Sequence, residues 1–409
     1  MVGSGPQTEN RDARRPLEAL NFFMADMQAG IGPFLGVFLQ SHGWQTGAVG
    51  SVMSLGGIAG MFVTAPAGAL VDATKRKRSL IILSGVMTVL ASTLILISQK
   101  FWVIAASQVA TAIAGAAIGP AVVGVTLGIV RQRGFNAQNG RNQAFNHAGN
   151  MVGAGLSGLL GWRFGFAAVI WLAAGFAVLS IVSVLMIKRQ AIDDDAARGL
   201  EARPDRADAP KGLKILLESK PLLVLAASLA LFHLGNGAML PLYGMAVVGA
   251  HKGDPAGFVA LTIVVAQAVM IVAALVAMRL ARTRGYWLVL LITFIALPIR
   301  GLVAASVISG WGVWPVQVLD GIGAGLQSVA VPGLVARIMN GTGRVNVGQG
   351  AVMTTQGLGA ALSPALGGWM AQAIGFRATF ALLGCFSLVS LALWLAFAPM
   401  LKPACANPE

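Results

Sequence analysis

The 409-residue sequence has little charge and little cysteine. Charged residues make up 11% of the chain, whereas a soluble globular protein has about 25%. Apolar residues make up 56%, which is more than a core of this size can hold, so the chain must use lipid as part of its solvent. The two cysteines, Cys385 and Cys405, are too few for a disulfide framework or a cysteine-based metal site.

Motifs of catalysis are also missing from the sequence. It contains no strand-flanked phosphate loop, no nucleophile elbow and no His/Cys set at metal-binding spacing. We therefore expect no enzyme activity and no cofactor beyond an ion gradient. The polar segment 1–16 precedes an apolar run that is too long for a cleaved signal peptide, so we interpret it as a cytoplasmic tail leading into a retained helix.

Apolar runs of about 20 residues recur along the chain and predict an all-α membrane protein with twelve transmembrane helices. The predicted spans lie near 17–40, 46–71, 79–98, 101–129, 141–161, 165–187, 221–247, 256–281, 285–307, 311–337, 345–372 and 376–398.

The positions of the cations predict the orientation of these spans. With the N-terminus inside, 24 of the 29 lysines and arginines fall in cytoplasmic segments, four fall outside, and Arg300 lies within a helix. This bias predicts a multi-pass protein of the cytoplasmic (inner) membrane with both termini in the cytoplasm. The net charge of +14 is therefore explained by topology, and we expect no nucleic-acid partner.

The chain divides into two similar halves. Gly149 pairs with Gly359, Gly165 with Gly375, and Asp26 with Asn236, all at an offset of 210 residues. Two six-helix halves related in this way, with a site between them, are typical of transporters. The predicted organisation is a tail (1–16), an N-terminal bundle (17–187), a cytoplasmic linker (188–220), a C-terminal bundle (221–398) and a second tail (399–409).

The stretch "GALVDATKRKR" between the second and third spans resembles the loop signature of the major facilitator superfamily, and the resemblance extends over essentially the whole chain. Ala73 and Lys75 depart from the usual Arg and Gly. The resemblance implies a fold of two pseudo-symmetric six-helix bundles and a gating role for the loop. A plain topology anchor would explain the cations but not the acid and glycine. The matching gating-loop residues are Gly68, Leu70, Asp72, Arg76, Lys77 and Arg78.

The segment "GAALSPALGG", Gly359 to Gly368, resembles a helix signature of proton-driven drug exporters, with Ser363 in place of one glycine. This resemblance favours export. Small residues at this spacing also let helix backbones approach closely, which is the structural alternative.

Three ionisable residues are predicted at membrane depth, where charge is costly and usually functional. Asp26 lies about 14 Å into the first helix, near the bilayer midplane. A desolvated carboxyl there suits proton coupling, and the alternative is a structural acid that is paired or hydrated. Arg300 and Asp320 lie on helices joined by a short link, so we predict an ion pair between them. The alternative to a structural ion pair is that Arg300 and Asp320 form a site that binds an anion or a proton.

Polar side chains share faces of several predicted helices. Asn146, His147 and Asn150 follow helical spacing, as do His233, Asn236 and Tyr243. In the resembled family the helices carrying these residues line the cavity, which implies a substrate site that also includes Gln317 and Gln356. The alternative is helix–helix hydrogen bonding.

These features together predict a proton-coupled secondary transporter that moves a small organic solute by alternating access, with export slightly favoured. A proton-coupled uptake symporter shares almost every feature. A membrane sensor or scaffold without flux is the alternative from another class. We expect the lipid bilayer and a small-molecule substrate as partners, and a monomer.

Overall fold

The computed structural model describes residues 6–29, 32–194, 196–198, 218–250, 255–339 and 345–406. Within these ranges the regular secondary structure is helical, with no strand. The chain forms two compact units. Unit 1 comprises Met1–Pro33 and Ala59–Arg206, and unit 2 comprises Phe34–Ile58 and Ala207–Glu409.

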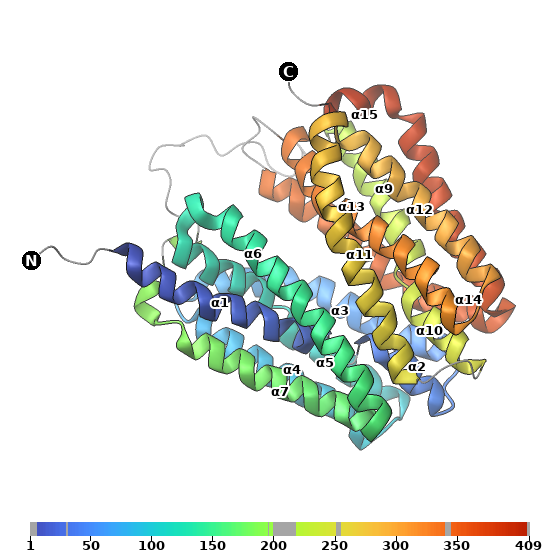
Figure 1. Cartoon of the computed structure of the whole chain (residues 1–409), viewed down its shortest axis with the longest axis horizontal. Helices are drawn as coiled ribbons and strands as arrows, with labels where there is room; N and C mark the ends of the chain where they lie inside the picture. Colours follow the sequence, from blue (N-terminus) through green and yellow to red (C-terminus); the bar gives the residue numbers. More distant parts are fainter. Residues whose placement is uncertain are drawn as a thin grey trace, which may run out of the picture. The chain divides into compact units, whose positions relative to one another are not determined.

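The helices of unit 1 cover most of the N-terminal half of the sequence (Figure 1). They are α1 (Pro6–Ala29), α4 (Lys77–Ile97), α5 (Phe101–Gly115), α6 (Ile118–Phe164), α7 (Phe166–Met186), and the short 3-10 turns η1 (Arg189–Ala191) and η2 (Ala196–Arg198). Helix α3 (Thr46–Ala73) is shared between the units, and its second part, from Ala59 onward, belongs to unit 1.

Unit 2 holds the C-terminal helices together with two segments from the start of the chain. Its helices are α2 (Gly32–Ser41), the first part of α3, α9 (Lys220–Asn236), α10 (Met239–Gly249), α11 (Pro255–Arg284), α12 (Tyr286–Ser306), η3 (Gly310–Gly312), α13 (Val313–Ile338), α14 (Val345–Ala396) and α15 (Ala398–Cys405).

The predicted spans are helical, but three of them, the first, the fourth and the seventh, are each divided between two helices. The first predicted span consists of two helices, α1 and α2, on either side of residues 30 and 31. The fourth predicted span is divided between α5 and the first part of α6, and the seventh is divided between α9 and α10. Arg131 has a left-handed φ of 56°, so α6 is kinked between the fourth and fifth predicted spans.

Nine helical stretches in the described part of the chain are long and apolar enough to cross a membrane. The last of them, Gly348–Ala396, covers two predicted spans, whereas 17–40 and 141–161 are not among the nine. The all-α membrane fold is therefore confirmed, and the count of twelve crossings is supported in part.

Glycine produces the same backbone turn in both halves of the sequence. Gly165 has φ 79° and ψ 175° between α6 and α7, and Gly375 has φ 80° and ψ 164° within α14. This region of φ and ψ is essentially restricted to glycine. Gly285 adopts the same conformation between α11 and α12, but its repeat position is Lys75, so the bends at Gly165 and Gly375, each followed by phenylalanine, are the ones that the two halves share.

The faces of α4 show that this unit is built for lipid. Ile81, Thr88 and Ile95 point inward and are buried, whereas Leu83 and Leu90 are more than half exposed. In a water-soluble helix the exposed positions would carry polar side chains. Leucine on the outer face and a small polar side chain on the inner face are the arrangement expected of a membrane helix.

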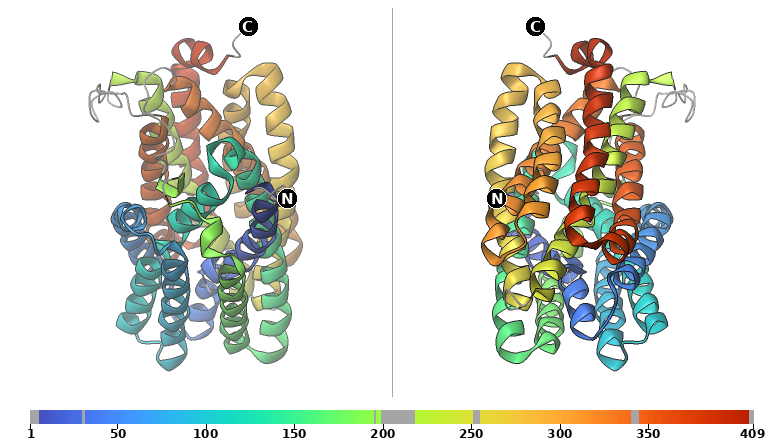
Figure 2. Two further views of the ribbon diagram at one scale, coloured as in Figure 1. Left: turned by 90° about the vertical axis from the view of Figure 1, so that its left-hand side faces the viewer. Right: turned by 90° about the vertical axis from the view of Figure 1, so that its right-hand side faces the viewer.

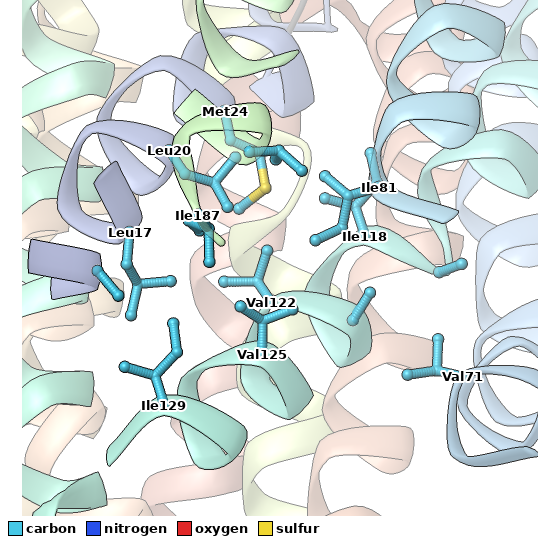
Figure 3. Packing of buried hydrophobic residues seen from close by; sticks show 14 of the residues in the cluster. Leu17, Leu20, Met24, Val71, Ile81, Ile118, Val122, Val125, Ile129 and Ile187 are labelled. Atoms are coloured by element: carbon cyan, nitrogen blue, oxygen red, sulfur yellow. The ribbon is translucent and has the colours of Figure 1, made fainter. Parts of the chain in front are cut away.

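The core of unit 1 lies where α1 packs along α6 and α7. Aliphatic side chains from these helices, from α3 and from α4 meet there without a polar group among the cluster members. Figure 3 shows this cluster from close by; its labelled members are Leu17, Leu20, Met24, Val71, Ile81, Ile118, Val122, Val125, Ile129 and Ile187.

Unit 2 is organised around long helices that pack side by side. Helix α9 packs along α14, α11 packs along α13, and α12 contacts both α13 and α14 (Figures 1 and 2). The first part of α3 joins this unit through polar contacts to α14. Thr46 Oγ1 donates to the carbonyl oxygen of Gly368 at 3.0 Å, and Ser54 Oγ accepts from the backbone N–H of Ala365 at 2.9 Å.

Candidate functional site

A buried arginine is the centre of the candidate site in unit 2. Arg300 on α12 is 1% exposed. Its Nη1 donates to Oδ1 of Asp320 at 2.7 Å and to Oδ1 of Asn236 at 2.5 Å, and its Nη2 donates to Oε1 of Gln317 at 3.4 Å. The guanidinium therefore joins α9, α12 and α13, and its charge is balanced by the Asp320 carboxylate.

Helical spacing and a short connection bring these groups together. Gln317 and Asp320 are three residues apart on α13, so they lie on one face of the helix. Only a brief connection containing η3 separates α12 from α13, and this connection makes the two helices neighbours. Asn236 at the end of α9 completes the network by donating from Nδ2 to Oδ1 of Asp320 at 3.3 Å.

A second polar group in unit 2 surrounds His233, one turn before Asn236. Its Nε2 lies 3.1 Å from Oε1 of Gln327 and 3.2 Å from Nε2 of Gln356. A ring nitrogen that donates to Gln327 cannot accept from Gln356 at the same time. The tautomer of His233 therefore decides which of the two bonds forms: a protonated Nε2 donates to Gln327, and an unprotonated Nε2 accepts from Gln356.

Buried donors without acceptors occur in both of these groups. Within the described part of the chain, Nε of Arg300, Nε2 of Gln317 and Nε2 of Gln327 are buried and make no hydrogen bond. A buried polar group in this condition costs about 1–3 kcal/mol. The guanidinium N–H and the two amide NH2 groups therefore retain hydrogen-bonding capacity that is not used in this conformation.

Unit 1 contains a polar cluster that sequence reasoning missed. Glu18 on α1 is 4% exposed, and its Oε1 accepts from Nε2 of Gln138 at 3.2 Å and from Nε of Arg141 at 2.8 Å. Asn142 accepts from Gln138 at 3.1 Å and donates to Oγ1 of Thr126 at 3.0 Å. The i, i+3, i+4 spacing of Gln138, Arg141 and Asn142 on α6 was the available signal.

Two of the predicted cavity residues on α6 take part in contacts within unit 1. Asn146 donates from Nδ2 to the carbonyl oxygen of Asn21 on α1 at 3.4 Å, and Asn150 donates to Oδ1 of Asn146 at 3.3 Å. Gly149 lies between them, and a Cβ there would collide with the carbonyl oxygen of Phe22. His147 is half-buried on the same helix.

Tyr243 lies apart from His233 and Asn236, on α10. Its side chain is fully buried, and its hydroxyl donates to the carbonyl oxygen of Val307 at 2.5 Å. The carbonyl oxygen of Ser309 lies 3.3 Å from the same hydroxyl. Val307 follows the end of α12, so these bonds give Tyr243 a structural function in holding the α12–α13 connection.

The proton-coupling and gating-loop predictions fall partly outside the described residues. Asp26 lies on α1 and Asp72 on α3, but the side chains of both are outside the described part of the structure. At the start of α4, Lys77 is buried and its Nζ donates to the carbonyl oxygen of Thr74 in the preceding loop at 3.0 Å. Arg78 donates from Nη2 to the carbonyl oxygen of Leu185 at 3.1 Å.

The other gating-loop residues are more accessible. Arg76 is exposed, and Gly68 has open space where a Cβ would be placed. Among the residues that the structure describes, no group of three or more His, Cys, Asp or Glu side chains is placed to hold a metal ion.

Comparison with known proteins identifies relatives by sequence. Residues 18–347 match the family model of the Major Facilitator Superfamily. Uncharacterized MFS-type transporters from two strains of Mycobacterium tuberculosis are each 36% identical to the chain over 387 residues, covering 94% of this chain and 93% of the relative.

Solved structures share the fold at low sequence identity. A mutant form of the nucleoside transporter NupG matches with a TM-score of 0.78 and 13% identity, over 94% of this chain and 99% of that one. A POT family transporter in complex with 5-aminolevulinic acid matches with a TM-score of 0.75 and 12% identity, over 95% and 96% of the two chains. At this level of identity, the likeness establishes the fold alone.

Proposed function

Because the chain belongs to the Major Facilitator Superfamily, a family of membrane transporters, we propose that it is a proton-coupled secondary transporter. It moves a small polar organic solute by alternating access across the cytoplasmic membrane, with export as its direction. Both termini lie in the cytoplasm in this proposal, which the distribution of lysine and arginine along the sequence supports.

The observation that carries the proposal is the buried network of Asn236, Arg300 and Asp320. Sealing a guanidinium in an apolar bundle costs desolvation free energy that a hydrophobic side chain of similar volume would avoid. Both hydrogen bonds to Asp320 use Oδ1, and its side chain is 15% exposed, so the carboxylate remains reachable. A charge buried at this free-energy cost within a transporter fold supports a role for the network in substrate binding or proton coupling.

The unpaired donors support a class of substrate. Nε of Arg300 and the Nε2 atoms of Gln317 and Gln327 would all be satisfied by acceptor oxygens or nitrogens. The structural neighbours include a nucleoside transporter and a transporter in complex with 5-aminolevulinic acid, and both kinds of molecule carry such acceptors. A polar metabolite with carbonyl, carboxylate or ring-nitrogen acceptors is therefore the proposed cargo.

Proton coupling in this proposal uses Asp26. Its position on α1 is equivalent to that of Asn236 in the repeat, so an acid in one half corresponds to a member of the buried network in the other. A carboxyl at membrane depth can carry a proton across the cycle because its neutral form is favoured where water is scarce.

Export is proposed on the resemblance of Gly359 to Gly368 to the exporter signature. In the structure these small residues also permit close packing. A Cβ at Gly359 would collide with the carbonyl oxygen of Ala230, and one at Gly367 would crowd Ala238. Packing therefore accounts for part of the pattern, and direct measurement of flux decides the direction.

The test begins with untargeted metabolite profiling of medium and cytosol from cells that express the wild type or Asp26→Asn. A compound enriched in the medium with wild type identifies an exporter and its cargo together. The compound is then measured in proteoliposomes, where an imposed pH gradient should drive its flux through the wild type. Asp26→Asn should abolish the pH-driven flux, and Glu218→Gln, which removes an exposed acid, is the matched control.

Three results would contradict parts of the proposal. Faster depletion of a compound from the medium would show uptake. Equal pH dependence in wild type and Asp26→Asn would remove Asp26 as the proton carrier. No solute flux in proteoliposomes, with any compound that binds the purified protein, would favour a sensor.

A further inference from the structure

A pocket of about 390 Å³ lies in unit 1, outside the polar clusters described above. It is formed by the loop between α3 and α4, the first turn of α4, the end of α7 and the start of the linker. The residues that line it are Lys75, Arg76, Lys77, Arg78, Ser79, Ile82, Leu185, Arg189, Ile192 and Asp194.

The lining of this pocket is strongly cationic. Five of its residues are lysine or arginine, and Asp194 is the acidic residue among them. Lys75, Arg76 and Arg189 are exposed, so their charges are directed to whatever enters from solvent. Cations gathered around one cavity repel one another, and an anion bound between them relieves that repulsion.

Backbone and side-chain donors face the same region. Helix α4 begins at Lys77, and the preceding Arg76 makes no side-chain cap, so the first-turn N–H groups contribute a partial positive charge. The Nε of Arg78 is buried and has no hydrogen-bond acceptor. The exposed guanidinium of Arg76 and the N–H groups at the start of α4 are donors of the kind that phosphate oxygens accept.

The position of the pocket favours a ligand from the membrane over a ligand from solution. It lies at the ends of two membrane-crossing helices, Lys77–Ile97 and Phe166–Met186. Leu185 is 57% exposed on its rim, and Ile82 and Ile192 also line it. Apolar side chains beside cations at a helix end are what a phospholipid meets at the membrane surface, with its headgroup near the charge and its chains near the leucine.

The linker side of the pocket is held in place. Asp193 donates its backbone N–H to the carbonyl oxygen of Gly128 at 3.0 Å, and its carboxylate pairs with Arg131 at 2.8 Å. Close packing of Ile192 against Gly128 leaves no room for a side chain at that glycine. Arg189 and Asp194 are therefore carried by a docked segment, so the pocket is part of the folded unit.

We propose that this pocket binds a phosphate group, carried by the headgroup of an anionic phospholipid of the cytoplasmic leaflet. The loop that resembles the gating signature and the linker that follows α7 both contribute to it, so its occupancy ties these two segments together. A soluble phosphate compound would satisfy the same donors, and the experiment separates the two sources.

The test measures binding of fluorescently labelled phosphatidylglycerol to the full chain in detergent. The double variant Arg76→Gln with Arg189→Gln removes two exposed pocket cations. The control Arg279→Gln with Arg284→Gln removes two exposed cations from unit 2, so both variants carry the same net charge. We expect the apparent Kd to rise about twentyfold in the pocket variant and less than about twofold in the control.

Competition then identifies the source of the phosphate. Unlabelled phosphatidylglycerol should displace the probe at much lower concentrations than inorganic phosphate or phosphatidylcholine, which supports the lipid. Displacement by inorganic phosphate at similar concentrations would support the phosphate site and assign it to a soluble compound. Equal loss of binding in the two double variants, or equal competition by phosphatidylcholine, would overturn the proposal.

Discussion

The two units each contain an arginine–carboxylate pair among buried polar groups, and the pairs differ in how they meet solvent. In unit 2 the Arg300 side chain is 1% exposed and that of Asp320 is 15% exposed. In unit 1 the Glu18 side chain is 6% exposed, but its partner Arg141 is 64% exposed. In unit 2 the cation is buried and the carboxylate is partly exposed, whereas in unit 1 the carboxylate is buried and the cation is open to the surface.

The helix contacts of the two halves are much more alike than their charges. Gly149 of α6 approaches Phe22 of α1 so closely that a Cβ would strike a carbonyl oxygen, and Gly359 of α14 approaches Ala230 of α9 in the same way. The repeat has therefore kept the scaffold while the charged groups diverged. Among the side chains that the structure describes, the comparison assigns the cost of a fully buried cation to the C-terminal half.

The largest expected effect comes from breaking the pair of Arg300 and Asp320. Arg300→Leu leaves the Asp320 carboxylate without its cation in an apolar bundle, and we expect a loss of about 3–5 kcal/mol in unfolding free energy. Arg300→Leu combined with Asp320→Asn should recover much of this loss. Thermal unfolding of the purified variants in detergent measures both effects. A double variant as unstable as the single one would argue against the pair.

A smaller loss of unfolding free energy is expected when a close helix contact is disturbed in either half of the chain. Gly149→Ala and Gly359→Ala each place a Cβ against a backbone carbonyl, so each should cost about 1–3 kcal/mol. Gly155→Ala and Gly357→Ala are the controls, because open space surrounds both positions. Thermal unfolding of all four variants would show the symmetry of the scaffold. A cost in one half alone would mean that the helix contacts are not equivalent.

A weaker effect is expected at the pair of Glu18 and Arg141 in unit 1. Arg141→Gln should lower stability by less than about 1 kcal/mol, because water screens a cation that is 64% exposed. Glu18 keeps the hydrogen bond from Gln138 in this variant. Unfolding midpoints of Arg141→Gln and wild type provide the measurement. A loss as large as that of Arg300→Leu would erase the difference between the two pairs.

The smallest effect concerns the two thiols, and it changes reactivity rather than stability. Burial raises the pKa of the Cys405 thiol to about 12, although the nearby Arg337 cation opposes this shift. The protonated thiol therefore predominates at any ordinary pH, and thiolate is the reactive form. Cys385 is exposed. In the Cys385→Ser variant, a maleimide at pH 8 should leave Cys405 nearly unlabelled in the folded protein and label it after denaturation, as read by mass spectrometry; full labelling of the folded protein would place Cys405 in a more open site.

Much of the fold could be predicted because membrane helices are recognisable in a sequence as long runs of residues with low polarity. The short link between Arg300 and Asp320 was enough to predict their contact, since adjacent antiparallel helices meet at similar depths. The participation of Asn236 in that contact could not be derived, because it depends on how α9 packs beside α12.

Other features escaped prediction for specific physical reasons. Glu18 lies close to the predicted start of the first span, where polarity needs no explanation, so its burial against α6 carried no signal. The division of the fourth span between α5 and α6 was hidden because the residues on both sides of Gly115 are mostly apolar. Tyr243 shares a helical face with Asn236 by spacing, but α9 and α10 are separate helices, so the spacing does not apply across them.

The contact between the start of α3 and α14 has a consequence for biosynthesis. Thr46 and Gly368 are hydrogen-bonded across 322 residues of sequence. At about 5–20 residues per second, a ribosome needs roughly 15 to 60 seconds to synthesise the partner after Thr46 has been made. During that interval the serine- and glycine-rich face of α3 has no α14 to pack on, so newly made chains depend on the membrane or on an insertion factor to cover it. A chain truncated before α14 should therefore be recognised and degraded by quality-control proteases even if its earlier helices are inserted.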